Sequence, residues 1–115
     1  MADPPELLPG LLAYRAGRYF EAHERWEERW RAEDDGDRRL MAQALVQLAG
    51  ALHKWSTGIR PGGAPALLAR CEAKLARLEQ AGARPFGLDP GRLRRGVRRL
   101  AEEGPQGELR PPALP

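Results

Sequence analysis

The chain has 115 residues, of which 30% are charged and 42% hydrophobic, and its formal net charge is +3. This length fits one domain and excludes a large enzyme with several sites, while the composition is that of a globular protein and indicates neither a disordered tail nor a membrane protein. No window is apolar enough to span a bilayer, and the first ten residues carry two acids and no signal-like run. We therefore expect a cytoplasmic protein.

Strand signals are missing from the chain, since no segment alternates between apolar and polar residues and valine occurs only at positions 46 and 97. We expect an all-α fold, a compact single-domain bundle of about five helices around a central apolar helix. Glycine and proline breakers divide the chain into helices over residues 10–16, 18–33, 37–57, 65–81 and 89–103. These form one domain over 1–103, followed by a Pro-rich tail over 104–115, either extended or frayed.

The segment 18–33 predicts a helix with an apolar stripe and a polar rim. Tyr19, Trp26 and Trp30 fall on the stripe. His23 and Glu27 lie four residues apart at its edge, so that they share one face of the helix. They form either a hydrogen-bonded pair or half of a site.

The segment 37–57 predicts the central helix. Between positions 40 and 52 the only polar side chains are Gln43 and Gln47, so the other helices should wrap this one. Two glutamines on such a helix need partners, because an unsatisfied buried amide costs about 1 to 3 kcal/mol. A polar group should therefore face them.

The last two helices are ordinary amphipathic helices. Cys71 lies in the apolar stripe of 65–81, which indicates a buried and inert thiol. The segment 89–103 begins at an Asp89 N-cap with Pro90 in the first position. It carries five arginines, Arg92, Arg94, Arg95, Arg98 and Arg99.

This arginine-rich helix has three interpretations. A solvated face is the simplest. Nucleic acid binding is disfavoured but stays open, because arginines contact phosphates and yet no aromatic residue is interleaved for base stacking. The third is pairing with the acidic N-terminal half, within one chain or between the chains of a homodimer.

The segment Glu21 to Glu27 (E-A-H-E-R-W-E) shares its H-E step with the zinc-protease motif, but Glu27 stands where the second histidine is needed, so that function is excluded. A different divalent metal site stays open, with His23, Glu27 and either Glu24 or His53 as ligands. In the structural alternative, His23 and Glu27 bond to each other and to a glutamine and fix how the two helices dock.

Two ordered motifs, E-A-H-E-x-x-E at 21–27 and Q-x-x-x-Q-x-x-x-x-x-H at 43–53, resemble a known family. From about Leu12 to Leu78 the chain resembles the domain-of-unknown-function family numbered 309, small helical proteins mainly of bacteria and archaea. The resemblance implies a compact all-helical domain and no established activity. It implies polar motif residues at Glu21, His23, Glu24, Glu27, Gln43, Gln47 and His53. The arginine-rich helix and the tail depart from the family pattern.

We expect a polar cleft between the helices 18–33 and 37–57 that takes a metal or a small ligand. Its expected lining is His23, Glu24, Glu27, Gln47 and His53, with Glu21 and Gln43 completing the polar network. If the protein is an enzyme, which stays open, Glu24 or Glu27 would be the general base and His23 its partner. The competing hypothesis is an interaction module for protein or nucleic acid, in which the network is structural.

Overall fold

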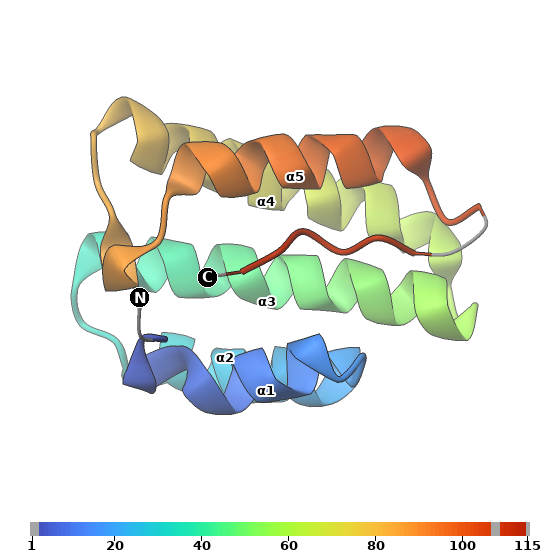
Figure 1. Ribbon diagram of the computed structural model, residues 1–115, viewed down its shortest axis with the longest axis horizontal. Coiled ribbons are helices and arrows are strands. Elements are labelled where there is room, and N and C mark those ends of the chain that lie inside the picture. The colour runs from blue at the N-terminus through green and yellow to red at the C-terminus, as the bar shows by residue number, and fades with distance from the viewer. Residues whose placement is uncertain (1–2, 107–108, 115) are drawn as a thin grey trace.

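The computed structural model describes residues 3–106 and 109–114 and contains five α-helices and three short 3-10 turns within them (Figure 1). No strand occurs in this part of the chain, and the all-α class is confirmed. The elements are η1 (Pro5–Leu7), α1 (Leu8–Arg15), α2 (Tyr19–Ala32), α3 (Gly36–Thr57), η2 (Pro61–Gly63), α4 (Ala64–Gln80), η3 (Pro85–Gly87) and α5 (Pro90–Glu103). Each α-helix begins and ends within two residues of the range that the breakers indicate.

The central helix is α3, which packs directly against α2 on one side and α4 on the other. Eight of its residues are buried, as its apolar sequence requires. The outer helices pack elsewhere, α1 against α2 and α5 against α4, and both lie nearer the viewer in Figure 1. The expectation that all four helices wrap α3 was therefore too broad. None of the helices in the described ranges combines the length and apolar character that crossing a bilayer requires.

Aspartate caps begin two of the helices. The Asp35 carboxylate accepts a hydrogen bond from the Arg38 amide of α3 at 2.9 Å, and the Asp89 carboxylate accepts one from the Arg92 amide of α5 at 3.2 Å. Pro90 follows at the first position of α5, so the predicted cap is confirmed. Gly58, with φ 71°, ends α3 in the left-handed conformation.

Trp26 anchors α2 in the core. Its side chain is 1% exposed, and its Nε1 donates a hydrogen bond to the Leu7 carbonyl at 3.2 Å. The indole lies against the backbone of Gly10, where an added Cβ would be 2.2 Å from Nε1. Only a glycine fits there. Trp30, expected on the same apolar stripe, is instead half-buried beneath the Arg39 guanidinium, 4.7 Å from the ring centroid.

The tail is extended and packed over its described residues, 109–114, so the frayed alternative was wrong for them. It returns along the molecule between α1 and α5 (Figure 1). The Tyr14 hydroxyl of α1 donates to the Pro112 carbonyl at 2.6 Å, and Leu114 is buried. On the other side Pro112 packs against Gly96 of α5, where an added Cβ would lie 3.0 Å from the proline Cβ. The tail thus fills the space between the two outer helices.

Candidate functional site

A cleft of about 170 Å³ opens where α2, α3 and the first turn of α4 meet. Its lining comes from three helices and consists of Phe20, His23, Gly50, His53, Lys54 and Leu67. Five of its six lining residues come from the two helices that carry the family motifs. Its lining differs from the expected one, since His23 and His53 belong to it, whereas Glu24, Glu27 and Gln47 do not.

Three flat rings form one side of this cleft. Phe20 is stacked with His23, with ring centroids 6.2 Å apart and an interplanar angle of 12°. It also contacts His53 across the helix interface, at 5.1 Å and 46°. The Phe20 side chain is nevertheless 54% exposed, so its ring can contact a ligand. Phe20 was not among the predicted site residues, although its aromatic side chain falls beside Glu27 on the polar rim of the helix and could have been included on that ground.

Gly50 and Lys54 shape the rest of the cleft from α3. An added Cβ at Gly50 would lie 3.4 Å from Leu67 Cδ1 and 3.5 Å from His23 Cδ2, so the absent side chain leaves a shallow floor between them. Lys54 stands one turn further along α3, and its stem lies close to Gly63 of η2. None of the described residues that line the cleft is acidic. The Lys54 ammonium therefore gives the cleft an electrostatic preference for anions.

His23 and Glu27 face each other without a hydrogen bond. The distance from His23 Nδ1 to Glu27 Oε2 is 3.8 Å, which is too long for one. Glu27 accepts instead from Arg31 Nη2 at 2.7 Å. Among the described residues, the buried atoms His23 Nδ1 and Gln47 Oε1 have no hydrogen-bond partner. The hydrogen bonds that a structural His-Glu-Gln network requires are therefore not made at these two atoms.

The remaining motif residues lie away from the cleft. Glu21 is exposed and pairs with Arg18 at 3.0 Å, and Glu24 is exposed as well. Gln43 is half-buried and does not line the cleft. Over residues 3–106 and 109–114, no three histidine, cysteine, aspartate or glutamate side chains come together in a group that could hold a metal ion. The structure thus offers the His23–Glu27 pair without a third ligand.

Three of the α5 arginines reach acids of α4, and two of them, Arg94 and Arg98, do so at short distances. Arg94 Nε donates to Glu79 at 2.9 Å, and Arg98 Nη2 lies 2.6 Å from Glu72. Among the described residues, the ion pairs of the α5 arginines are with acids of α4 and α5, so the interpretation that this helix pairs with the acidic N-terminal half of the same chain is not supported. The reason is that α5 packs along α4 and brings these two acids within reach.

The single cysteine is buried as predicted, since Cys71 is 0% exposed. Burial raises the pKa of its thiol to about 12. The thiol is thus protonated at neutral pH, which disfavours nucleophilic chemistry.

The family assignment agrees with the motifs. The family model described as "Domain of unknown function (DUF309)" matches residues 7–65. None of the curated proteins and none of the solved structures matches the chain significantly. The matched range holds every lining residue of the cleft except Leu67, and it leaves α5 and the tail outside. The chain belongs to the DUF309 family, a family of helical domains whose function is not established.

Proposed function

We propose that the cleft between α2, α3 and α4 binds a small planar acid, of the class of aromatic carboxylates. The observation that carries this proposal is the lining of the cleft, which combines the cationic side chain of Lys54 with three flat rings and includes no described carboxylate. A planar ring packs on Phe20 and the imidazoles, and a carboxylate pairs with Lys54.

The size of the cleft limits the ligand. Its volume of about 170 Å³ is below the 300 Å³ or more of sites for drug-sized molecules. It suits one ring with one acidic group. Such a small ligand on a half-open surface should bind with a Kd on the order of 0.1 mM.

The unpaired polar atoms count against the purely structural alternative. Leaving a buried acceptor without a partner costs about 1 to 3 kcal/mol, so polar atoms in protein interiors are nearly always paired. His23 Nδ1 is such an atom, and its residue lines the cleft. A structural His-Glu-Gln network would be expected to pair this atom, and it is unpaired.

A divalent metal is the second ligand class to test. His23 and Glu27 supply two donors, and a stable site needs three or four. Catalysis has less support, because Glu27 is held by Arg31 and the exposed Glu24 does not line the cleft. The proposal is therefore binding, with no chemical step.

The test is a titration of the 15N-labelled protein with benzoate, followed by amide chemical shifts. We expect saturable shifts at positions 20, 23, 50, 53 and 54. Lys54→Gln should weaken binding about tenfold, since one charge-assisted contact is lost. Lys74→Gln is the matched control, because Lys74 is the only other lysine of the chain, and it should bind as wild type does.

Three results would overturn this proposal: no saturable shift, equal losses in both lysine variants, or shifts spread over the whole surface. A parallel titration with zinc and manganese separates the two ligand classes. Tight binding of zinc that His23→Ala abolishes, with no response to benzoate, would replace the acid with a metal.

Protein binding at the same end of α3 is the second candidate function. Phe20 in the cleft is 54% exposed and Ile59, two residues after the end of α3, is 62% exposed, and large exposed apolar side chains of this kind can contact a partner. Light scattering over a range of concentrations tests its simplest form, a homodimer. A dimer mass that Phe20→Ser with Ile59→Ser abolishes would favour it, and a monomer at every concentration would contradict the homodimer.

A further inference from the structure

Away from the cleft, a second hollow runs between α5 and the tail. It has a volume of about 400 Å³ and is lined by Arg92, Arg95, Gly96, Arg99, Pro112 and Ala113. We call it the arginine groove. One wall is helical and the other is the extended chain at 112–113. It lies outside the part of the chain that matches the family model.

The five arginines of α5 divide into two rows. Arg94 and Arg98 lie on the α4 side, in ion pairs of 2.9 and 2.6 Å with Glu79 and Glu72. Arg92, Arg95 and Arg99 follow at spacings of three and four residues, which places them on one face of the helix. This second row lines the arginine groove.

The charges of the second row are poorly compensated. Arg95 and Arg99 reach carboxylates only at 3.8 and 3.9 Å, and their side chains are 65% and 54% exposed. Such long exposed contacts contribute little free energy. Among the described residues, Arg92 has no carboxylate partner for its guanidinium. The groove therefore presents three cationic groups whose donors are available.

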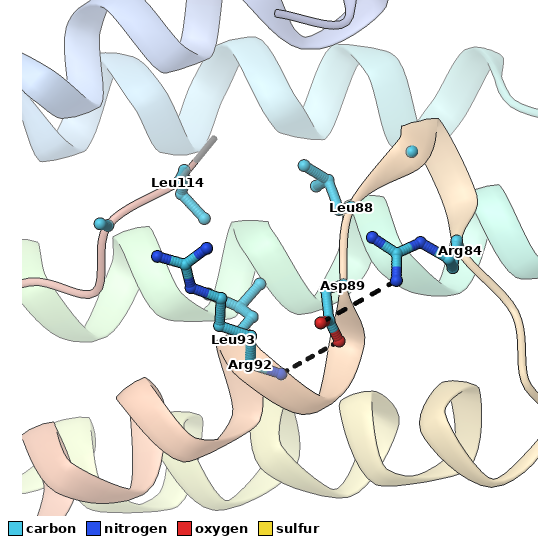
Figure 2. A pocket seen from close by; sticks show the side chains of 8 residues that line it. Arg84, Leu88, Asp89, Arg92, Leu93 and Leu114 are labelled. Atoms are coloured by element: carbon cyan, nitrogen blue, oxygen red, sulfur yellow. Dashed lines mark hydrogen bonds and ion pairs between the residues drawn. The ribbon is translucent and has the colours of Figure 1, made fainter. Parts of the chain in front are cut away.

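Arg92 lies where the arginine groove joins a smaller hollow. That hollow, of about 110 Å³, is lined by Leu88, Leu93, Leu114 and their neighbours. Figure 2 shows the Arg92 guanidinium turned away from the Asp89 carboxylate, on the side of Leu114. Asp89 is occupied by the Arg92 amide and by Arg84 Nη1, the latter at 3.9 Å. Apolar side chains beside the guanidinium raise the strength of its electrostatic interactions.

The tail forms one wall of the groove and is held in place by specific contacts. Pro112 is fixed by the Tyr14 hydroxyl and packs on Gly96, which lies between Arg95 and Arg99 on α5. Because position 96 has no side chain, the tail comes close to the helix backbone and the arginines stand on either side of the contact. A larger residue at 96 would push the wall away.

We propose that the arginine groove binds a small ligand that carries two or more phosphates. Guanidinium groups bind phosphate oxygens through paired hydrogen bonds, and three of them at positions 92, 95 and 99 span about 10 Å along the helix. That length matches a chain of two or three linked phosphates. The groove has no aromatic side chain among its lining residues, and the tail closes one side of it, so a nucleic acid strand fits it less well.

The probe for this proposal is inorganic tripolyphosphate, titrated by calorimetry at about 0.15 M salt to screen distant charges. Arg95→Gln with Arg99→Gln should weaken binding at least about tenfold. The matched control is Arg94→Gln with Arg98→Gln, which removes the same charge from the same helix but from the other row. We expect it to change the Kd by less than about threefold. Circular dichroism verifies that both double variants are folded.

The remaining outcomes are decisive against the proposal. Equal weakening in both double variants would show that net charge alone attracts the probe. An absence of binding by wild type up to about 10 mM tripolyphosphate would remove the site altogether. A single-stranded oligothymidine that binds more tightly than tripolyphosphate, and depends on both rows, would make this face a nucleic acid surface instead.

Discussion

Helices α2 and α5 are both 14 residues long and both densely charged, yet they neutralise their charges in different ways. The acids and bases of α2 are mixed, and their ion pairs lie along the chain at spacings of three and four residues, as in Arg25 with Glu28 and Arg31 with Glu27. α5 has five arginines and only two acids, both at its end, and its strong pairs reach across to α4. The ion pairs of α2 are local in sequence, whereas the short ion pairs of α5 depend on its neighbour.

This difference indicates where binding sites arise. On α2 the charged residues mostly satisfy one another, so the site there depends on the residues that do not, His23 and Phe20, together with Lys54 from α3. On α5 the neighbour pairs closely with one row, whereas Arg95 and Arg99 of the other row reach carboxylates only at 3.8 and 3.9 Å and line the arginine groove. On a highly charged helix, the residues without a close ion-pair partner therefore indicate a binding site better than the total charge does.

The largest expected effect concerns the core contact that holds α2, because internal ion pairs contribute little to its attachment. Gly10→Ala places a Cβ 2.2 Å from Trp26 Nε1 and must displace the indole. We expect a loss of about 3 kcal/mol in the free energy of unfolding, measured with urea. Gly36→Ala is the control, since nothing lies within 4 Å of its added Cβ. A loss below about 1 kcal/mol for Gly10→Ala would show that α2 is attached in another way.

The second largest effect concerns the docked tail, which forms one wall of the arginine groove beside α5. Tyr14→Phe removes the hydrogen bond to the Pro112 carbonyl and leaves a buried acceptor, which should cost about 1 to 2 kcal/mol. The tail should also become accessible to proteases at Arg110 while the helices stay folded. Unchanged stability and cleavage would contradict the docked tail.

Removing single ion pairs, either between two helices or within one helix, should have a smaller effect on the free energy of unfolding. Glu79→Gln weakens the contacts of α4 with Arg94 and Arg95, and we expect a loss of about 1 kcal/mol. Glu28→Gln removes one exposed pair within α2, at 3.9 Å, and should cost less than about 0.5 kcal/mol. Urea unfolding of both variants measures the difference. Equal losses would remove the distinction between the helices.

The smallest expected effect on stability comes from removing the negative charge of Asp89, the N-cap of α5. The hydrogen bond from the Arg92 amide, together with Arg84, lowers the pKa of Asp89 below its usual value of 3.8. A lowered folded-state pKa means that the charge stabilises the protein above the unfolded pKa, and that this is lost as pH falls through the folded pKa. Asp89→Asn keeps a capping side chain, so it should be about 0.5 kcal/mol less stable than wild type at pH 7.

The comparison of wild type with Asp89→Asn should be repeated at low pH. The difference in stability should shrink as the pH falls below about 4 and vanish once Asp89 is protonated in the folded state. A difference that stays constant down to pH 2 would mean that the carboxylate charge has no role in the cap.

The sequence was most informative about features that depend on local order. Breakers delimit the helices to within two residues, and Asp89 followed by Pro90 indicates the start of α5, because capping and backbone conformation depend on neighbouring residues. The two ordered motifs were enough to indicate the family.

Features that depend on how helices pack could not be predicted in the same way. The contact between Tyr14 and Pro112 joins residues 98 apart, and a proline-rich segment has no periodicity that would show which surface it covers. The division of the arginines into two rows depends on how α5 is rotated against α4. Phe20 became a site residue only because α3 places His53 against it.

The most direct test of this account is to map two probes on one labelled sample, benzoate for the cleft and tripolyphosphate for the arginine groove. We predict two separate sets of amide shifts, one around Phe20, His53 and Lys54 and the other around Arg95 and Arg99, with each probe leaving the other set unchanged. A single set that responds to both probes, or no saturable shift with either, would contradict the account.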